Sequence, residues 1–317
     1  MKNIFIIAAL LLAANFSLSY AADETDNAEG KVAVEGGNIW YKIVGKSKKG
    51  VPLLVVHGGP GATHDYLEPL EALADERPVI FYDQLGSGKS DRPSDEKLWT
   101  VERFVRELAA LRKELKLEKV HILGQSWGTM LAASYMLAEK PSGVVSLIFS
   151  GPFFSSKIFA ADCRERVKKL NIRSVEAIFK AESKGDFSGE EYKMAMDEFY
   201  KKHVCNLAPW PECFNRTLDG MGFEVYSSMW GPSEFSVTGT LKDLDITGRL
   251  GEITVPALLT GGEFDEISPE TVKSYAAKFK NSKFLIFDGC THSHHLEKTG
   301  EYIKEIINFI KNAENKM

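Results

Sequence analysis

The sequence predicts an α/β fold in which a mostly parallel sheet is covered by helices on both faces. Short apolar runs at 51–56, 79–82 and 119–123 have the length of buried strands. Stretches with helical spacing lie between them, and strands that alternate with helices are typical of parallel sheets. The chain has 317 residues, of which 44% are hydrophobic and 26% charged, so it can form a large core.

The first half of the chain contains the elements of this alternation in order. Residues 31–44 alternate around a Gly-Gly-Asn turn and predict a hairpin. A strand at 51–56 precedes a helix at 65–74, and a strand at 79–82 precedes an amphipathic helix at 101–117. These elements predict the first part of the sheet and its covering helices.

The alternation continues with a strand at 119–123, a helix at 129–140 and a strand at 144–149. It is then interrupted over 151–249, where charged helical segments and residues rich in Gly, Pro and Trp replace it. The predicted helices of this insertion are 161–169, 175–184 and 189–203.

Two further strand–helix pairs follow the insertion. They are strand 255–260, helix 269–279, strand 283–287 and helix 296–312. We therefore expect a core made of residues 22–150 and 250–317, with residues 151–249 inserted as a helical cap.

The functional prediction depends on the motif GQSWG at 124–128. It is a G-x-S-x-G pattern between a strand and a helix, the context of a nucleophile elbow. Glycines on both sides of Ser126 permit a tight turn, and the following helix directs its N-terminal N–H groups at negative charge that develops there. The alternative is an ordinary glycine-rich turn; we predict that Ser126 is a nucleophile.

A serine nucleophile needs a neighbouring base, which in turn needs an acid to orient it. The histidines after Ser126 are His203, His292, His294 and His295. His203 lies in the insertion, whereas His292 follows the last predicted strand directly and is the predicted base. His294 and His295 remain close competitors.

The acid is expected just past the preceding strand, because sheet-based hydrolases have the chain order Ser, acid, His. The segment TGGEFDE at 260–266 offers three carboxylates there. Asp265 has the better position, and Glu263 is the alternative.

Acyl transfer also requires N–H donors for the oxyanion of the tetrahedral intermediate. Trp127, the residue after the nucleophile, supplies one main-chain N–H. The segment HGGPG at 57–61 follows an early strand and suits the second donor, for which we favour Gly59 over Gly58.

Several other site classes are disfavoured. The segment GSGKS at 86–90 resembles the end of a phosphate-binding loop, but Asp83 stands where the full pattern requires Gly. The net charge of −5 and the lack of a basic cluster argue against nucleic acid. No cysteine or histidine spacing resembles a metal site, and the predicted chemistry needs no metal or cofactor.

Residues 1–21 predict a signal peptide, with Lys2, an apolar stretch at 4–16 and a small-x-small cleavage site at 19–21. We expect export, a mature chain that starts near Ala22, and no membrane association afterwards. Export permits disulfides, and Cys205 and Cys213 flank a Pro-rich loop across which they could pair.

Five segments together resemble the prolyl iminopeptidase family of α/β-hydrolases. They are HGGPG at 57–61, YDQLGSGKS at 82–90, GQSWG at 124–128, GEFDE at 262–266 and CTH at 290–292. The stretch WGPSEFSVTGTLKDLDIT at 230–247 resembles in particular the tricorn-interacting aminopeptidase branch, and the likeness extends over about 31–312.

This resemblance implies an α/β-hydrolase fold and a serine exopeptidase that releases an N-terminal residue, often proline, from short peptides. It also implies that Glu234 and Glu266 hold the free amino group of the substrate. A protonated amine near neutral pH would form charge-assisted hydrogen bonds with two carboxylates. The alternative for these two residues is solvated surface charge.

Two other functions remain open from the sequence. One is an esterase or amidase that uses the same three residues on small esters, lactones or amino-acid amides. The other is a weakly catalytic ligand-binding protein. A blocked amino group distinguishes the first from an aminopeptidase, because only the aminopeptidase needs the free amine.

Overall fold

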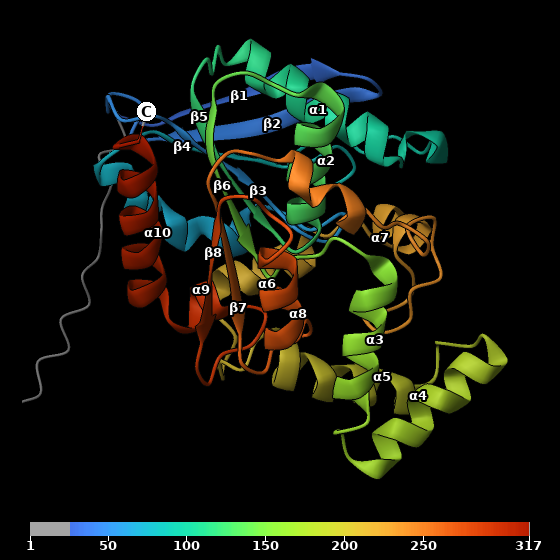
Figure 1. The fold of residues 1–317 in the computed structure, drawn as a ribbon. Helices are drawn as coiled ribbons and strands as arrows, with labels where there is room; N and C mark the ends of the chain where they lie inside the picture. The colour runs from blue at the N-terminus through green and yellow to red at the C-terminus, as the bar shows by residue number, and fades with distance from the viewer. Residues whose placement is uncertain (1–25, 317) are drawn as a thin grey trace, which may run out of the picture.

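The computed structural model describes residues 26–316 of the chain (Figure 1). The signal peptide predicted at 1–21 lies outside the described residues. Within them, eight strands form one sheet in the order β1-β2-β4-β3-β5-β6-β7-β8. Strand β2 pairs antiparallel with β1 and β4, and all other neighbours are parallel. The predicted mostly parallel α/β sheet is confirmed.

The strand positions follow the apolar runs of the sequence closely. The strands are β1 (Ala28–Val34), β2 (Gly37–Val44), β3 (Leu53–Val56), β4 (Val79–Tyr82), β5 (Val120–Gln125), β6 (Val144–Ser150), β7 (Ala257–Gly262) and β8 (Ser282–Phe287). Every residue of β3, β4, β5 and β7 is buried, as expected for parallel strands covered on both faces.

Helices cover both faces of this sheet (Figure 1). Helices α1 (Val101–Glu114) and α2 (Trp127–Glu139) pack together on one face, whereas η2 (Asp65–Asp75) and α10 (Thr299–Glu314) pack together on the other. The segment η2 is a 3₁₀ helix rather than the predicted α-helix, and it contains Pro69, a residue that disfavours the interior of an α-helix.

The core also contains shorter helices in the segments between its strands and after the last strand. They are η3 (Glu96–Leu98), η5 (Thr247–Glu252), α8 (Pro269–Ala276) and α9 (His294–Glu297). The Ser268 side chain caps α8 by accepting from the Thr271 N–H, and Pro269 begins that helix.

Between β6 and β7 the chain forms a group of helices beyond the ends of the strands (Figure 1). They are α3 (Ser156–Val167), α4 (Ile172–Lys184), α5 (Glu190–Phe199), α6 (Glu212–Asp219) and α7 (Phe223–Met229). The helix predicted over 189–203 ends earlier, at Phe199, and continues as a π-helical turn, Tyr200–Val204. We call this group the cap.

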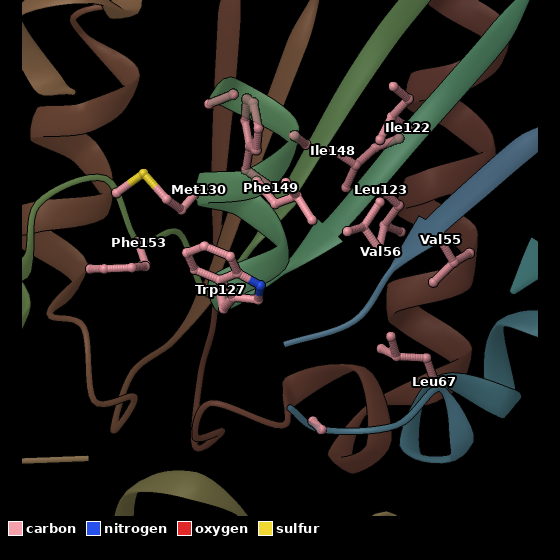
Figure 2. Packing of buried hydrophobic residues seen from close by; sticks show 14 of the residues in the cluster. Val55, Val56, Leu67, Ile122, Leu123, Trp127, Met130, Ile148, Phe149 and Phe153 are labelled. Carbon is pink, nitrogen blue, oxygen red and sulfur yellow. The ribbon is translucent and has the colours of Figure 1, made fainter. Parts of the chain in front are cut away.

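Part of the buried core lies where α2 packs against the centre of the sheet (Figure 2). Trp127 and Met130 of α2 are fully buried beside Phe149 of β6 and Phe153 (Figure 2). Because α2 is apolar around most of its surface, its position is fixed by packing on several sides.

The disulfide expected between Cys205 and Cys213 is not present, since all four cysteines are free thiols in the structure. Cys205 ends the π-helical turn, and its thiol lies against Ser293. Cys213 lies on α6 beside Glu68 and Arg216, so the two thiols contact different elements.

Among residues 26–316, none of the helices has both the length and the apolar composition that a bilayer-spanning helix requires.

Helix α1 carries a buried ion pair that supports the loop after β4. Arg103 and Glu107 are hydrogen-bonded to each other, and each is 1% exposed. Glu107 also accepts from the main-chain N–H of Leu85 at 3.3 Å. Arg106 of the same helix forms an exposed ion pair with Glu35, which lies in the turn between β1 and β2.

We expect Glu107→Ala to lower the free energy of unfolding by about 3–5 kcal/mol, because it leaves the Arg103 guanidinium buried without its counter-charge. The matched control, Arg106→Ala, removes only the exposed pair and should cost about 0–1 kcal/mol. Urea unfolding of both variants measures the difference. If both variants lose the same free energy of unfolding, burial does not determine how much each ion pair contributes to stability.

Candidate active site

Ser126 lies at a sharp turn between β5 and α2. Its backbone angles are φ 53° and ψ −122°, which few residues other than glycine adopt. The Ser126 N–H donates to the carbonyl of Ser150 on the neighbouring strand at 2.9 Å, which holds the turn in place. The predicted sharp turn at Ser126 is therefore present.

The flanking glycines are required by close backbone contacts. A Cβ at Gly128 would lie 2.1 Å from the carbonyl oxygen of Val56, and one at Gly124 would lie 2.3 Å from the carbonyl oxygen of Gly128. Any side chain at either position would therefore push α2 away from the sheet.

His292 and Asp265 are brought together by the loops after β8 and β7. His292 Nδ1 lies 2.7 Å from Asp265 Oδ1, and both side chains are almost fully buried. The Asp265 carboxylate also accepts from the N–H groups of Gly262 at 3.3 Å and Ile267 at 3.1 Å. These bonds fix the carboxylate, so that His292 Nδ1 carries a proton and Nε2 faces the opposite way.

The electrostatics of this pair favour an ionised acid and a basic imidazole. Burial alone would raise the pKa of Asp265, but the charge and hydrogen bond of His292 outweigh it and the pKa is lowered. Burial alone would lower the pKa of His292, but the charges of Asp265 and Glu266 raise it to about 10.

The competing residues of the sequence analysis have other contacts. His294 Nε2 lies 3.0 Å from Ser150 Oγ and 2.9 Å from Thr260 Oγ1, so it bridges the ends of β6 and β7. His295 Nε2 lies 3.1 Å from the Tyr66 carbonyl. Glu263 is exposed and accepts from the Gly289 N–H at 2.8 Å.

Ser126 and His292 line one cavity of about 80 Å³ beneath the cap. Its apolar wall is formed by Val204, Phe214, Leu218 and Met221. Within the described residues, the Ser126 hydroxyl forms no hydrogen bond with His292, whose Nε2 lies 3.7 Å from Glu266 Oε1. Hydrogen bonds between a nucleophile and its base are often long or poorly aligned in unliganded sites, and they shorten when substrate binds.

The candidate oxyanion donors lie close to Ser126: Gly59 lines the same cavity, and Trp127 directly follows the serine in the chain. The Gly58 N–H donates to the Tyr66 hydroxyl at 2.8 Å and is therefore occupied. Gly59 follows it with φ +108°, and Trp127 is the first residue of α2, where an N–H has no partner within the helix. Gly59 and Trp127 therefore remain the candidate donors.

A buried hydrogen-bond network joins the motifs around these donors. The Trp127 indole donates to Gln84 Oε1 at 2.9 Å, and the Gln84 amide donates to the His57 carbonyl at 2.9 Å. The Gln84 N–H donates to His57 Nε2 at 2.9 Å. The network links the ends of β3, β4 and β5, which explains why HGGPG and DQ occur together.

The segment 86–90 folds around Asp83. The Asp83 carboxylate accepts from the N–H groups of His64 and Lys89, each at 2.8 Å. A Cβ at Gly88 would lie 2.2 Å from this carboxylate, so the glycine is needed for the turn. The anionic Asp83 occupies the position where a phosphate-binding loop would hold its anion.

Glu234, in the segment that follows α7, and Glu266, in the loop after β7, both line the cavity. Glu234 Oε1 accepts from the hydroxyl groups of Tyr226 at 2.8 Å and Tyr200 at 3.3 Å. Glu266 is 1% exposed, and within the described residues its Oε2 has no hydrogen-bond partner.

Burial raises the pKa of both carboxyl groups. For Glu266 the charge of Glu234 adds to burial and raises the pKa well above its ordinary value. For Glu234 the two tyrosine hydroxyls only partly offset burial, and the pKa remains raised. A cation placed between these carboxylates would satisfy both.

The structure adds residues that the sequence analysis did not identify. Gly151, with φ +57°, leaves room for His292, because a Cβ there would lie 2.5 Å from the imidazole. Tyr200 and Tyr226 orient Glu234. A glycine directly after a predicted strand was a usable signal for Gly151, whereas no spacing pattern marks the two tyrosines.

Among the described residues, one group could hold a metal ion: His64, Asp65 and Glu68, whose ligand atoms lie within 4.8 Å of one another. Arg216 is ion-paired with Asp65 and Glu68, and His64 is paired with Asp83. An ion would have to displace these partners.

The family model described as alpha/beta hydrolase fold matches residues 51–299. A proline iminopeptidase of Heyndrickxia coagulans is 45% identical over 283 residues, which cover 89% of this chain and 98% of that protein. A proline iminopeptidase of Lactobacillus crispatus is 40% identical over 280 residues, 87% of this chain and 95% of that one.

Two solved structures are also similar to this chain over most of its length. The proline iminopeptidase of Mycobacterium smegmatis superposes with a TM-score of 0.83 and 33% identity, over 91% of this chain and 99% of that one. The structure of VinJ superposes with a TM-score of 0.86 and 33% identity, over 90% of this chain and 99% of that one. Esterases and an enol-lactonase at 16–20% identity share the fold.

The burial of Glu266 predicts a pH-dependent stability. Its pKa is raised in the folded state, so the native protein binds an extra proton and loses stability as the pH rises above about 4.5, the ordinary value. We expect Glu266→Gln to increase the free energy of unfolding at pH 8, because the neutral amide removes the cost of the buried charge. The gain should vanish near pH 4.

Urea unfolding at pH 4 to 8 measures this gain. Glu263→Gln is the matched control, since it makes the same change at an exposed carboxylate of the same loop and should show no such pH dependence. A Glu266→Gln variant that is less stable than the wild type at pH 8 would contradict the expected cost of the buried charge.

Proposed function

The chain belongs to the proline iminopeptidase family of α/β hydrolases, and from this premise we propose that it is a serine exopeptidase that releases N-terminal proline from short peptides. The observation that carries the proposal is the cavity in which Ser126 and His292 lie beside two carboxylates, Glu234 and Glu266. A hydrolase without preference for an amine would have no use for this pair.

In the proposed mechanism Ser126 attacks the carbonyl carbon of the N-terminal residue. The carboxylates around His292 favour its protonated form in the unliganded site. Once the ammonium of the substrate offsets their charge, His292 Nε2 takes the serine proton and then donates it to the leaving amine, while Asp265 holds the imidazole through Nδ1 and stabilises its protonated form. Water then attacks the acyl-enzyme with His292 as the base, and the free amino acid leaves. All proton transfers use this chain's own side chains.

The N–H groups of Gly59 and Trp127 stabilise the oxyanion of both tetrahedral intermediates. The engagement of the Gly58 N–H by Tyr66 supports Gly59 as the donor. The hydrogen bond from Trp127 to Gln84 supports a fixed position for the start of α2. Donors that are fixed before the reaction need no reorganisation when charge develops.

Glu234 and Glu266 select the free N-terminus. A protonated secondary amine, such as that of proline, carries two N–H donors, one for each carboxylate. The unpartnered Oε2 of Glu266 supports this role, because a buried carboxylate oxygen without a donor is costly until the amine binds. An internal peptide bond offers no such cation and would leave both carboxylates unpaired.

The cavity also favours a small apolar first residue. About 80 Å³ bordered by Phe214, Leu218 and Met221 suits a pyrrolidine ring better than a long or charged side chain. Burial of the ring against these side chains contributes binding free energy through the hydrophobic effect.

We also propose that the protein is exported after cleavage of residues 1–21, on the basis of the apolar stretch at 4–16 and the small residues before Ala22. Mass spectrometry of the protein from its host should find a chain that starts near Ala22 outside the cytoplasm. A chain that retains Met1 and stays in the cytoplasm would refute export.

The substrate proposal predicts a selective effect of Glu234→Gln. We expect kcat/KM for prolyl p-nitroanilide to fall about 10- to 100-fold, because a hydrogen bond to a charged group contributes about 1.5–3 kcal/mol. Hydrolysis of an N-acetylproline ester, which has no cationic amine, should change little. Steady-state kinetics on the two substrates measures the contrast.

Two controls accompany this experiment. Glu224→Gln changes an exposed carboxylate of the cap and should leave both rates unchanged. Ser126→Ala should abolish both activities while circular dichroism shows an intact fold. Equal losses on both substrates would remove Glu234 from amine recognition, and a wild-type rate in Ser126→Ala would refute the mechanism.

A further inference from the structure

The cap contacts the two loops that carry Asp265 and His292, and one of these contacts comes from α3. Arg166, at the end of α3, is 9% exposed. Its Nε donates to the main-chain carbonyl of Asp265 at 2.8 Å, and its Nη2 donates to the carbonyl of Glu263 at 3.1 Å. On the same helix, Asp162 accepts from the Ser268 N–H at 2.8 Å. Helix α3 therefore holds the acid-bearing loop from both ends.

The second contact comes from the π-helical turn Tyr200–Val204. His203 Nδ1 donates to the carbonyl of Phe264, the residue before Asp265, at 2.8 Å. The carbonyl of His203 accepts from the N–H of His292 at 3.0 Å, and that of Val204 accepts from the N–H of Ser293 at 2.8 Å. One turn of the cap thus binds the main chain of both loops. π-Helical turns occur frequently at functional sites.

The bonding pattern of Arg166 is unusual for a buried arginine. Within the described residues it forms no ion pair within 4 Å, so its buried charge is compensated by main-chain carbonyls. A guanidinium presents donors in a rigid planar fork, which suits two carbonyls at fixed positions. Arg164, two residues earlier, instead pairs with Glu182 inside the cap through two bonds of 3.0 and 2.9 Å.

From these contacts we propose that Arg166 and His203 are positioning residues for the reaction. They fix the main chain on which Asp265 and His292 are mounted, so that Nε2 of His292 stays directed into the cavity. The proposal rests on the catalytic roles proposed above for Asp265 and His292. It makes the cap part of the machinery that aligns the proton transfer, in addition to its role as the cover of the cavity.

The test compares Arg166→Gln with Arg164→Gln. Glutamine is too short to donate to both carbonyls, so we expect the kcat of Arg166→Gln for prolyl p-nitroanilide to fall about 10²-fold, the effect of misplacing reacting groups by about 1 Å. KM should change less than kcat, because the hydrogen bonds lost are to the main chain of Asp265 and Glu263 and not to the carboxylates of Glu234 and Glu266. The Arg164→Gln control loses a cap ion pair and should keep the wild-type kcat.

Two further readouts separate positioning from a general loss of structure. The rate at which a small organophosphorus reagent labels Ser126 should fall by the same factor as kcat in Arg166→Gln, since labelling needs the proton acceptor but no amine. The low-field proton resonance of His292 Nδ1–H should shift or broaden in Arg166→Gln and not in Arg164→Gln. Arg166→Lys, which keeps one donor group, should recover part of kcat.

The outcomes decide the proposal in either direction. Wild-type kcat and labelling in Arg166→Gln, or equal losses in the two arginine variants, would overturn it. If Arg166→Gln does not fold, His203→Phe keeps the ring beside Phe199 and removes the donor to Phe264, and the same kcat and labelling losses are expected. Ser126→Ala tests the mechanism itself, and an active Ser126→Ala variant would refute the proposed function. If Ser126→Ala is inactive but Arg166→Gln keeps the wild-type kcat, only the positioning role is refuted.

Discussion

The strained backbone of Ser126 is the constraint to which the rest of the site is fitted. A residue in such a region costs about 1–3 kcal/mol and persists only when its surroundings hold it there. Here the start of α2 is pressed against β3, with room only for glycine at Gly124 and Gly128. The direction of the serine hydroxyl is thereby fixed, and the base, the acid and Gly59 must reach it from the ends of other parallel strands.

The amine site shows that this chain places charge where it reduces stability. Glu234 and Glu266 share a cavity with His292, and burial together with mutual repulsion raises the pKa of Glu266. A protein that needed only a stable fold would place apolar groups at these positions. Under the proposed function, a cationic substrate would supply the missing counter-charge, and binding it would stabilise the folded protein.

The sequence predicted the fold and the motif positions well, because local signals determine both. Buried parallel strands are continuous apolar runs, and β4 lies at the predicted residues 79–82. The turn at Ser126 follows from two glycines between a strand and a helix. The amine site was named only through a family resemblance, and its tyrosine donors escaped notice, because contacts between a cap and a distant loop leave no local pattern. The pairing of Cys205 with Cys213 was wrong because proximity in sequence does not determine the direction of a thiol.

The place at which the cap is inserted explains why it can serve both recognition and alignment. It leaves the core after β6, where Gly151 lies against His292, and returns at β7, the strand that leads to Asp265. Within it, Tyr200 donates to Glu234 and the same π-helical turn binds the main chain of His292. A displacement of this turn would therefore disturb the amine carboxylate and the base together. Under the proposed roles, this short hydrogen-bonded segment couples the position of the base to that of the amine-binding carboxylate.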